Sequence, residues 1–290
     1  MTSYHAPQDL QLAWDTLRSL LAEQKFEQAG QLLLAHAEQL LEYNGWRALN
    51  AVLPLFPAHL FDEDPDFRYV EGLVYAKAGL HQEAINLLER ARFSYTTNQA
   101  YTKAAQCGLE LVRLYLGRDN FRTAYYYLNE EIEPLIERGL VTDPLVRARF
   151  FLRMAELCPD IGKLRVSVEY AHQAFATYKA IGDLPGQFYA LVRLAGTANH
   201  LGNYAEAASK LELAWSCYNT GNLGANARSR LLNIMIHQQW YQGKLEDALA
   251  LAANYLTLVD EEQFSNFRIY ARMLLGNLYR SHSEFAQAEQ

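Results

Sequence analysis

The stretches GNYAEAASKLELA (residues 202–214) and GKLEDALALAANY (residues 243–255) follow one pattern. Each begins with Gly, has an apolar residue two positions later and an Ala three positions after that, and then continues with apolar residues at intervals of three and four. Such intervals are typical of a helix with one buried face. A glycine just before the helix suits a tight turn, because glycine adopts positive φ values without strain. Both stretches therefore predict a tight turn followed by an amphipathic helix.

The same pattern recurs along nearly the whole chain. It is found again in residues 24–36, 79–91, 119–131 and 162–174, and a shortened copy, SEFAQA, covers residues 283–288. We call the position of the small residue the alanine slot. The alanine slots are separated by 55, 40, 43, 40, 41 and 40 residues and are occupied by Ala29, Ala84, Ala124, Ser167, Ala207, Ala248 and Ala288. A repeat of about 40 residues is the signature of an architecture built from stacked units.

Each repeat is expected to be a pair of antiparallel helices, A and B, with the alanine slot where helix B approaches helix A. One pair cannot bury its apolar face alone, so the pairs must stack. Helix starts fit this arrangement: Asp64 and Asp143 are predicted N-caps, each followed by a proline at the first helical position. Together with few prolines and no alternating strand pattern, the repeat predicts an all-α fold. We expect a right-handed superhelical α-solenoid of about seven helix pairs.

The repeat resembles the tetratricopeptide-repeat (TPR) superfamily. Gly72 with Tyr75 and Gly276 with Tyr279 stand at the usual offsets of that family in helix A. Other units depart from the pattern and have Ala155 and Cys158, Ala195 and Ala198, or Ile236 and Gln239 instead. The period of about 40 exceeds the usual 34 and is similar to the long-helix TPR arm of MalT-like bacterial transcription regulators.

The first interval, of 55 residues, adds to this resemblance. It contains Trp46, a Leu-Pro break and an acidic-proline helix start at residues 62–66. We expect residues 1–290 to form a single TPR-like solenoid, with a divergent hairpin and an extra helix in 1–60, regular repeats in 61–290 and a truncated last repeat. The chain has neither the nucleotide-binding motif nor the helix-turn-helix of MalT-like regulators, so we expect it to be a fragment from which an effector domain is missing.

Composition limits the function. The chain is 50% hydrophobic and 20% charged with a net charge of −7, which is typical of a soluble globular protein and argues against a general nucleic-acid binder. Three scattered cysteines, no basic-apolar leader and no apolar run long enough for a membrane span favour a reducing, cytoplasmic location. The eight histidines show no metal-ligand spacing, and no nucleophile elbow or phosphate-binding loop is found. We expect no catalytic site, no metal and no cofactor.

Candidate binding residues come from the repeat register. Helix A lines the concave face of such arms, where ligands bind. The offsets from the alanine slots place on that face Arg113, Arg149, Arg153, Tyr189, Arg193, Asn199, His200, Arg230, Asn233, His237, Trp240, Tyr270, Asn277 and Arg280, with Glu110 and Glu156 as acidic exceptions. Arginine matches carboxylate or phosphate, and asparagine hydrogen-bonds in both directions.

Two interpretations of these arginines stay open. In one, they pair with neighbouring glutamates between repeats and keep helix A soluble. In the other, they line a groove for an acidic peptide, a C-terminal carboxylate, or a small anionic or sugar-like ligand, with Trp240 and Tyr241 as a stacking wall beside Tyr189 and His200.

The function that this pattern favours is a non-enzymatic protein-interaction or ligand-sensing module. The resemblance implies the arm of a MalT-like transcription or signalling regulator; the alternative is a stand-alone TPR scaffold that clamps an acidic or C-terminal peptide. We expect no direct nucleic-acid binding and no membrane association. We also expect the uncapped last repeat to favour a homodimer.

Three consecutive tyrosines, Tyr125, Tyr126 and Tyr127, look like a ligand platform, but successive helical residues are about 100° apart and do not share a face. The register places them on helix B. It predicts that Tyr125 packs within its own repeat, Tyr127 packs on a neighbouring helix, and Tyr126 faces solvent.

Overall fold

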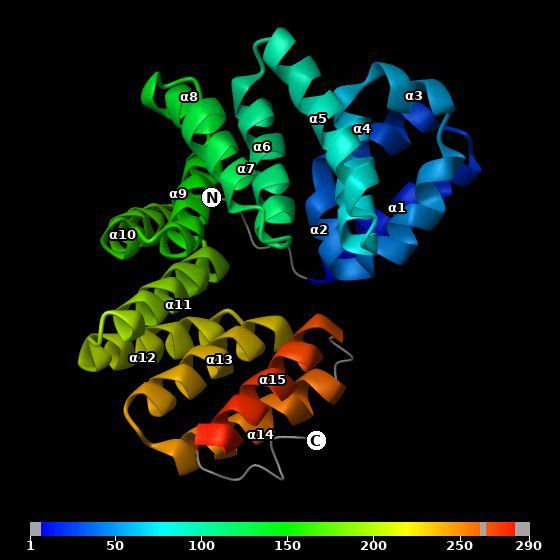
Figure 1. Ribbon diagram of the computed structural model, residues 1–290. Coiled ribbons are helices and arrows are strands. Elements are labelled where there is room, and N and C mark those ends of the chain that lie inside the picture. The colour runs from blue at the N-terminus through cyan, green and yellow to red at the C-terminus, as the bar shows by residue number, and fades with distance from the viewer. Residues whose placement is uncertain (1–6, 262–264, 282–290) are drawn as a thin grey trace. The chain divides into compact units, whose positions relative to one another are not determined.

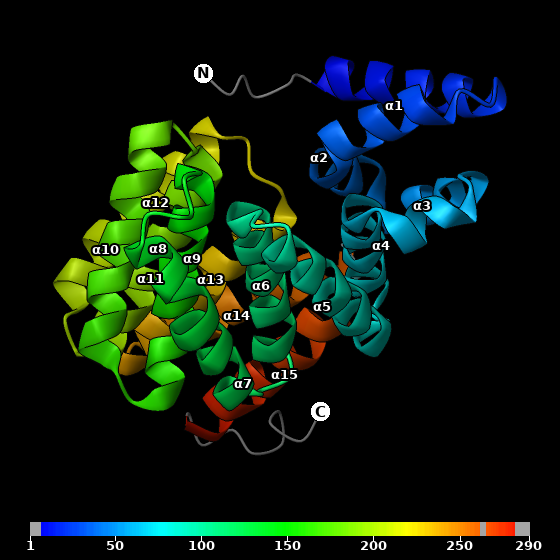
Figure 2. The same cartoon turned by 90° about the horizontal axis from the view of Figure 1, so that it is seen from above.

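The computed structural model describes residues 7–261 and 265–281, which divide into two compact units, 1–146 and 147–290. All regular structure in these described residues is helical (Figures 1 and 2). The first unit contains α1 (Pro7–Ala22), α2 (Phe26–Val52), η1 (Leu53–Leu55), α3 (Ala58–Glu63), α4 (Pro65–Ala78), α5 (His81–Thr97), α6 (Tyr101–Leu116), α7 (Phe121–Tyr126), η2 (Tyr127–Ile132) and α8 (Glu133–Glu137). The second contains nearly all of α9 (Pro144–Leu157), then η3 (Cys158–Ile161), α10 (Leu164–Ile181), α11 (Leu184–His200), α12 (Tyr204–Thr220), α13 (Ala225–Tyr241), α14 (Leu245–Glu261) and α15 (Ser265–Ser281).

Packing between consecutive helices confirms the all-α repeat. Helices α4 and α5, α11 and α12, and α13 and α14 pack as pairs. The alanine slots of the described residues are all fully buried: Ala29, Ala84, Ala124, Ser167, Ala207 and Ala248. Ala288 lies outside the described residues. Small side chains at these positions let helix B approach helix A, as the pattern predicted.

Local signals place the helix ends. Asp64 caps α4, where its carboxylate accepts a 2.8 Å hydrogen bond from the Asp66 amide, and Pro65 is the first helical residue. Asp143 accepts from the Leu145 amide at 2.8 Å in the same way before α9. Helix α4 ends at Gly79, whose φ of 83° is the left-handed conformation that glycine adopts most easily. In the next repeat Asp119 takes that conformation, with φ of 55°.

The long first interval holds an additional helical segment. Helix α2 is broken at Gly45, where φ is 74° and ψ is 166°, so the segment that carries Trp46 turns away from the first part. Pro54 then stops it in the short η1 turn. Phe56 packs edge-to-face on Phe67 of α4, with ring centroids 5.2 Å apart, and this joins the extra segment to the core of the first unit.

The three tyrosines are packing residues, and two of the three positions agree with the register. Tyr126 is 50% exposed, as predicted. Tyr127 is buried and stacks on Tyr115 of α6 at 5.7 Å, which belongs to its own repeat, while the neighbouring repeat contributes the Arg92 guanidinium, 5.4 Å from the ring centre. Tyr125 is half-buried. Tyr127 therefore packs on neighbouring helices, as the register predicted, whereas the prediction for Tyr125 stays a prediction.

The helix after these tyrosines is not a regular α-helix. Tyr127–Ile132 form a π-helical turn just before Pro134. Proline has no amide hydrogen for the carbonyl four residues earlier, and its ring collides with that carbonyl, so a wider turn relieves the conflict.

The described part of the chain contains no helix long and apolar enough to cross a membrane. Cys107 and Cys158 are buried, as expected for core thiols, Cys217 is half-buried, and none of the three forms a disulfide within the described residues. The expectation of one continuous solenoid over 1–290, with its subdivision at residue 60, stays a prediction.

Candidate functional site

Four of the predicted site residues meet on neighbouring A helices of the second unit. We define the arginine cluster as Arg153 of α9, Arg193 of α11 and Arg230 of α13, whose positive charges all act on the carboxylate of Glu156 of α9. Arg153 forms a direct ion pair with Glu156, one helical turn away. Asp160 also acts on Arg193, so the cluster has three positive charges against two negative ones in a protein whose net charge is −7.

The pKa of Glu156 reports this charge surplus. Burial acts to raise the pKa of its carboxyl, but the guanidinium groups of Arg153, Arg193 and Arg230 outweigh burial, and the net pKa lies below the ordinary value. Burial lowers the pKa of Arg193, with Glu156 acting in the opposite direction. Both groups are charged at neutral pH. The pKa of the Glu156 carboxyl is lowered, and the pKa of an arginine starts far above 7.

The guanidinium groups of Arg193 and Arg230 have donors that the fold does not engage. Within the described residues, neither guanidinium forms an ion pair or a hydrogen bond. The Arg230 guanidinium lies over the ring of Tyr189, 5.6 Å from its centre, so Tyr189 positions it by a cation–π contact. Donors that are held in place but unpaired are what an incoming carboxylate or phosphate requires.

A second group of predicted residues lies at the C-terminal ends of α11 and α13. We define the imidazole–aromatic cluster as His200, His237, Trp240 and Tyr241. His237 stacks on Trp240 at 5.9 Å and lies 5.6 Å from Tyr241. His200 lies 5.8 Å from Tyr241 across the two helices. Tyr241 and His200 are exposed, so this end of the two helices is accessible to solvent.

His237 links this cluster to α15. Its Nε2 lies 3.0 Å from the hydroxyl of Tyr270, whereas its Nδ1 is buried with no hydrogen-bond partner in the described residues. Burial lowers the pKa of His237, with a smaller contribution from His200. The imidazole is therefore neutral at pH 7.

Asn199 is placed differently from the sequence prediction. Only 3% of it is exposed, and its Nδ2 donates a 3.3 Å hydrogen bond to the Ile234 carbonyl of α13. It therefore lies between α11 and α13 and does not line an open surface. Its Oδ1 is buried without a partner among the described residues. The prediction had the helix face right but missed that the neighbouring backbone covers this position.

The other candidates lie elsewhere or have partners. Arg113 is in the first unit and pairs with Glu110 of its own helix at 2.8 Å. Asn233 hydrogen-bonds Tyr255 of α14, and Arg280 donates to Asn277 at the end of α15. Arg149 is half-buried and acts on the pKa of Tyr178 in α10. The ion pairs of Arg113 with Glu110 and of Arg153 with Glu156 are each made within one helix, not between repeats.

The first unit contains a cavity that the sequence did not indicate. The cavity has a volume of about 520 Å³ and is lined by residues of α4 and α5, namely Arg68, Glu89, Arg90, Arg92, Phe93 and Ser94. Arg68 is buried and donates to the carbonyls of Phe61 and Asp62 and to the Ser94 hydroxyl. The available sequence signal was Arg68, an arginine at a core position. The register led us to expect a groove only on the A helices, and α5 is a B helix.

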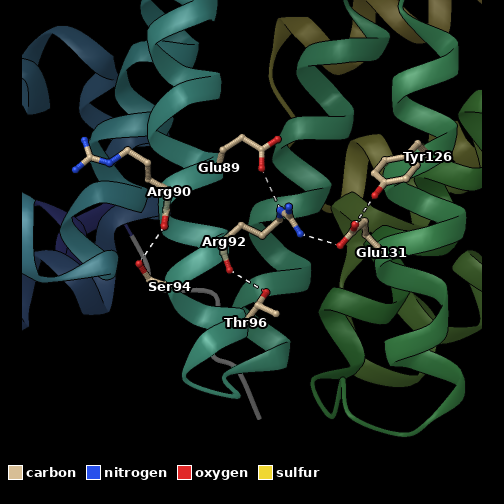
Figure 3. Close-up of polar contacts among 7 residues, drawn as sticks. All are labelled: Glu89, Arg90, Arg92, Ser94, Thr96, Tyr126 and Glu131. Carbon is tan, nitrogen blue, oxygen red and sulfur yellow. Dashed lines mark hydrogen bonds and ion pairs between the residues drawn. The ribbon is translucent and has the colours of Figure 1, made fainter.

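Arginines around this cavity are mainly structural. Figure 3 shows Arg92 between Glu89, at 3.2 Å, and Glu131 of η2, at 2.8 Å, while Arg90 points to the opposite side. The Tyr126 hydroxyl donates to the second oxygen of Glu131 at 2.7 Å. This network fixes the π-helical turn to α5 and pairs Arg92 with two carboxylates.

In the described ranges, no group of three or more His, Cys, Asp or Glu side chains is placed to bind a metal ion. The arrangement of the arginine cluster favours binding of a negatively charged group.

No family model matches the chain, and no curated protein matches it by sequence. Solved structures do match. A Rap protein complexed with competence and sporulation factor has a TM-score of 0.64 and 16% identity, over 97% of this chain and 74% of that one. The Rap conjugation gene regulator of plasmid pLS20, in complex with the Phr* peptide, has a TM-score of 0.64 and 14% identity, over 99% and 76%.

A third match is a signal transduction ATPase with numerous domains (STAND) from Pyrococcus horikoshii, which has a tetratricopeptide repeat sensor. Its TM-score is 0.60 at 13% identity, over 96% of this chain and 44% of that one. At these identities the likeness concerns the fold. The chain thus has the TPR-like helical solenoid fold that the 40-residue repeat predicted.

Proposed function

We propose that the chain is a peptide-sensing repeat module that binds a negatively charged segment of a protein partner on the A-helix face of its second unit. The observation that carries this proposal is the arginine cluster, in which Arg193 and Arg230 are positioned beside Glu156 yet unpaired. Two of the matched structures contain a bound signalling factor or peptide, which supports a peptide as the class of ligand.

Electrostatics supports this assignment over a merely structural role. A structural arginine in a repeat protein is expected to meet a carboxylate directly, as Arg153 and Arg113 do. Arg193 and Arg230 share the carboxylate of Glu156, which Arg153 already pairs, and Asp160 also acts on Arg193, so three positive charges meet two negative ones. An incoming carboxylate gains attraction there that water screens only in part, because the cluster is half-buried.

The binding mechanism follows from the stacking of repeats. The three arginines come from α9, α11 and α13, which are successive A helices. A ligand that contacts all three favours one stacking angle between repeats and shifts the population toward it.

The test is a pair of neutralising substitutions. Reversing Arg193 to an acid would place a second carboxylate beside that of Glu156, so Arg193→Gln with Arg230→Gln is the sharper variant. The matched control is Arg165→Gln with Arg228→Gln, two exposed arginines of the same unit. The probes are fluorescein-labelled hexaglutamate and hexalysine peptides, measured by anisotropy, with circular dichroism to check the fold.

We expect hexaglutamate to bind the wild-type chain and the control variant but not the Gln pair, and hexalysine to bind none of them. Equal hexaglutamate affinity for the Gln pair and the control would overturn the proposal.

The finer assignment is the arm of a MalT-like regulator. The likeness to the sensor-bearing STAND protein supports it, since this chain covers less than half of that one. Sequencing of the encoding gene tests it: a reading frame that contains nucleotide-binding and helix-turn-helix modules would support a regulator. A frame limited to repeats would support the alternative, a stand-alone scaffold that clamps an acidic or C-terminal peptide. That the chain is not an enzyme and works in the cytoplasm stays a prediction.

A further inference from the structure

The cavity lined by α4 and α5 contains a buried arginine without a counter-charge. Only 5% of Arg68 is exposed, and no carboxylate forms an ion pair with it within the described residues. Asp62 contributes its carbonyl, whereas its exposed side chain does not pair with Arg68. A buried guanidinium normally meets a carboxylate, because burying an unpaired charge is costly. Arg68 is therefore a buried positive charge that the fold surrounds with neutral oxygens.

These hydrogen bonds leave part of the Arg68 guanidinium unused. Its Nε donates to the Phe61 carbonyl at 3.1 Å, one terminal nitrogen donates to the Ser94 hydroxyl at 3.2 Å, and the other donates to the Asp62 carbonyl. A guanidinium has five N–H groups, so one N–H on each terminal nitrogen has no partner in the part of the chain that the structure describes. Such donors suit a carboxylate or a phosphate, which accepts from two N–H groups at once.

Arg90 brings a second positive charge to the same cavity. It is exposed, lines the cavity and forms no ion pair in the described ranges. Burial raises the pKa of the Glu71 carboxyl and the Arg90 guanidinium acts in the opposite direction, so these two charges attract each other at a distance. Figure 3 shows that Arg90 points away from Arg92, and so away from the two carboxylates that pair with Arg92.

Acidic residues are therefore distributed unevenly around the cavity. Glu89 and Glu131 both pair with Arg92, at 3.2 and 2.8 Å, so Arg92 is neutralised. At the other end, Glu71 attracts Arg90 without forming an ion pair, and Arg68 has no carboxylate partner in the described residues. Two guanidinium groups thus keep donors for an anion at that end.

Size and lining indicate what kind of anion fits. The volume of about 520 Å³ lies within the range of about 300–1,000 Å³ that is typical of small-molecule sites. A water molecule takes about 30 Å³ of liquid volume, so a bare inorganic anion leaves most of this space to solvent. Phe93 lines the cavity and is 71% exposed, so an apolar group that packs on its ring removes apolar surface from water.

We propose that this cavity is a second ligand site and that it binds a small organic anion. The carboxylate or phosphate of the ligand lies against Arg68 and Arg90, and the apolar part packs on Phe93. The site belongs to α4 and α5 of the first unit, so its ligand does not depend on the arginine cluster of the second unit.

Fluorine NMR with three probes tests the site. The probes 4-fluorobenzoate and 4-fluorophenyl phosphate carry the two kinds of anionic group on the same apolar ring, and 4-fluorobenzamide is the neutral match for the carboxylate. Each probe is titrated with the full chain at pH 7, and the change in its fluorine signal gives the affinity. Every titration is repeated on the variant Arg193→Gln with Arg230→Gln, which removes two arginines of the arginine cluster.

We expect at least one of the two anions to bind the wild-type chain and that variant equally, and the benzamide to bind neither. The anion that binds more tightly identifies the anionic group. Arg90→Gln should weaken binding about tenfold, because a charged hydrogen-bond donor is lost. The matched control is Arg122→Gln, which replaces an exposed arginine of α7 outside the cavity and should bind as the wild type does.

Two further variants test the other contacts. Phe93→Ala should weaken the binding of both anions, because it removes the apolar wall. Arg68→Gln should abolish binding, with circular dichroism to check the fold. Where Arg68→Gln fails to fold, Arg90→Gln and Phe93→Ala decide, because both replace exposed side chains.

Three results would overturn the proposal. These are equal anion affinity for Arg90→Gln and Arg122→Gln, benzamide binding as tight as benzoate binding, and anion binding that disappears when Arg193 and Arg230 are replaced. The last result would place the anion at the arginine cluster. None of them changes the hexaglutamate test, so the proposed function stands or falls separately.

Discussion

The hydroxyl of Ser167 donates a 2.7 Å hydrogen bond to the carbonyl of Ala155, in the buried contact between α10 and α9. Ser167 occupies the alanine slot of its repeat and is completely buried. A hydroxyl at such a position requires a partner, because an unpaired buried polar group is costly. The neighbouring helix supplies that partner, so serine replaces alanine there without disrupting the pair.

Ser167→Ala should therefore destabilise the protein only modestly. The substitution restores the residue found in the other slots but removes the hydrogen bond, and we expect a loss of about 0.5–1.5 kcal/mol in the free energy of unfolding. Urea denaturation measures it, with the exposed Ser209→Ala on α12 as control. Equal stability of the two variants would show that the hydrogen bond contributes nothing.

A large residue in a slot should have a stronger effect. Ala207 is completely buried between α12 and its partner helix, so Ala207→Leu forces the two helices apart and should cost about 1–3 kcal/mol. Ala205, two residues earlier on the same helix, is exposed, and Ala205→Leu should be nearly neutral. Similar thermal unfolding temperatures for both variants would contradict the slot as a close-packing position.

Local and periodic features were predictable from the sequence because they depend on residues near one another in the chain. The buried slot at Ala207, the cap at Asp64 and the turn at Gly79 follow from short patterns. The placement of Arg193 and Arg230 near one another was predictable only through the repeat register, which assigns both to the same face of successive A helices.

Features that depend on three-dimensional neighbours were not predictable. Asn199 is covered because its amide meets the Ile234 carbonyl, and no pattern in α11 shows where that carbonyl lies. Pro134 signalled a disturbance, but a kink and a π-helical turn are both compatible with it, and the network from Arg92 to Glu131 helps to select the turn. The role of Arg68 likewise depends on carbonyls of the preceding segment.

His237 should make stability depend on pH. Burial lowers its pKa in the folded protein below the value of 6.5 that it has when unfolded. As the pH falls below 6.5, the unfolded chain binds the proton first, so stability decreases until the pH has passed the lower, folded pKa. His237→Gln should weaken this loss, with a difference in slope of up to about 1.4 kcal/mol per pH unit.

Thermal unfolding of wild type and His237→Gln between pH 7.5 and pH 5 measures the effect. The exposed His172→Gln on α10 is the control and should follow the wild-type profile. Parallel profiles for wild type and His237→Gln would exclude the buried imidazole as the source.

Glu156 should oppose ligand binding while it stabilises the fold. Its carboxylate competes with an acidic ligand for the three arginines, so Glu156→Gln should bind hexaglutamate about fivefold more tightly, a gain of about 1 kcal/mol. The same change removes the carboxylate that pairs with Arg153, leaving Asp160 as the remaining counter-charge that acts on Arg193, and should lower the free energy of unfolding by about 1–3 kcal/mol. Because the folded pKa of Glu156 is lowered, this contribution to stability exists above pH 4.5 and disappears as the pH falls through the folded pKa.

Calorimetry and urea denaturation at pH 7 measure both effects of Glu156→Gln, on hexaglutamate binding and on stability, with the exposed Glu169→Gln as control. A variant that is less stable but binds hexaglutamate no better would mean that Glu156 is purely structural and does not share a site with the ligand.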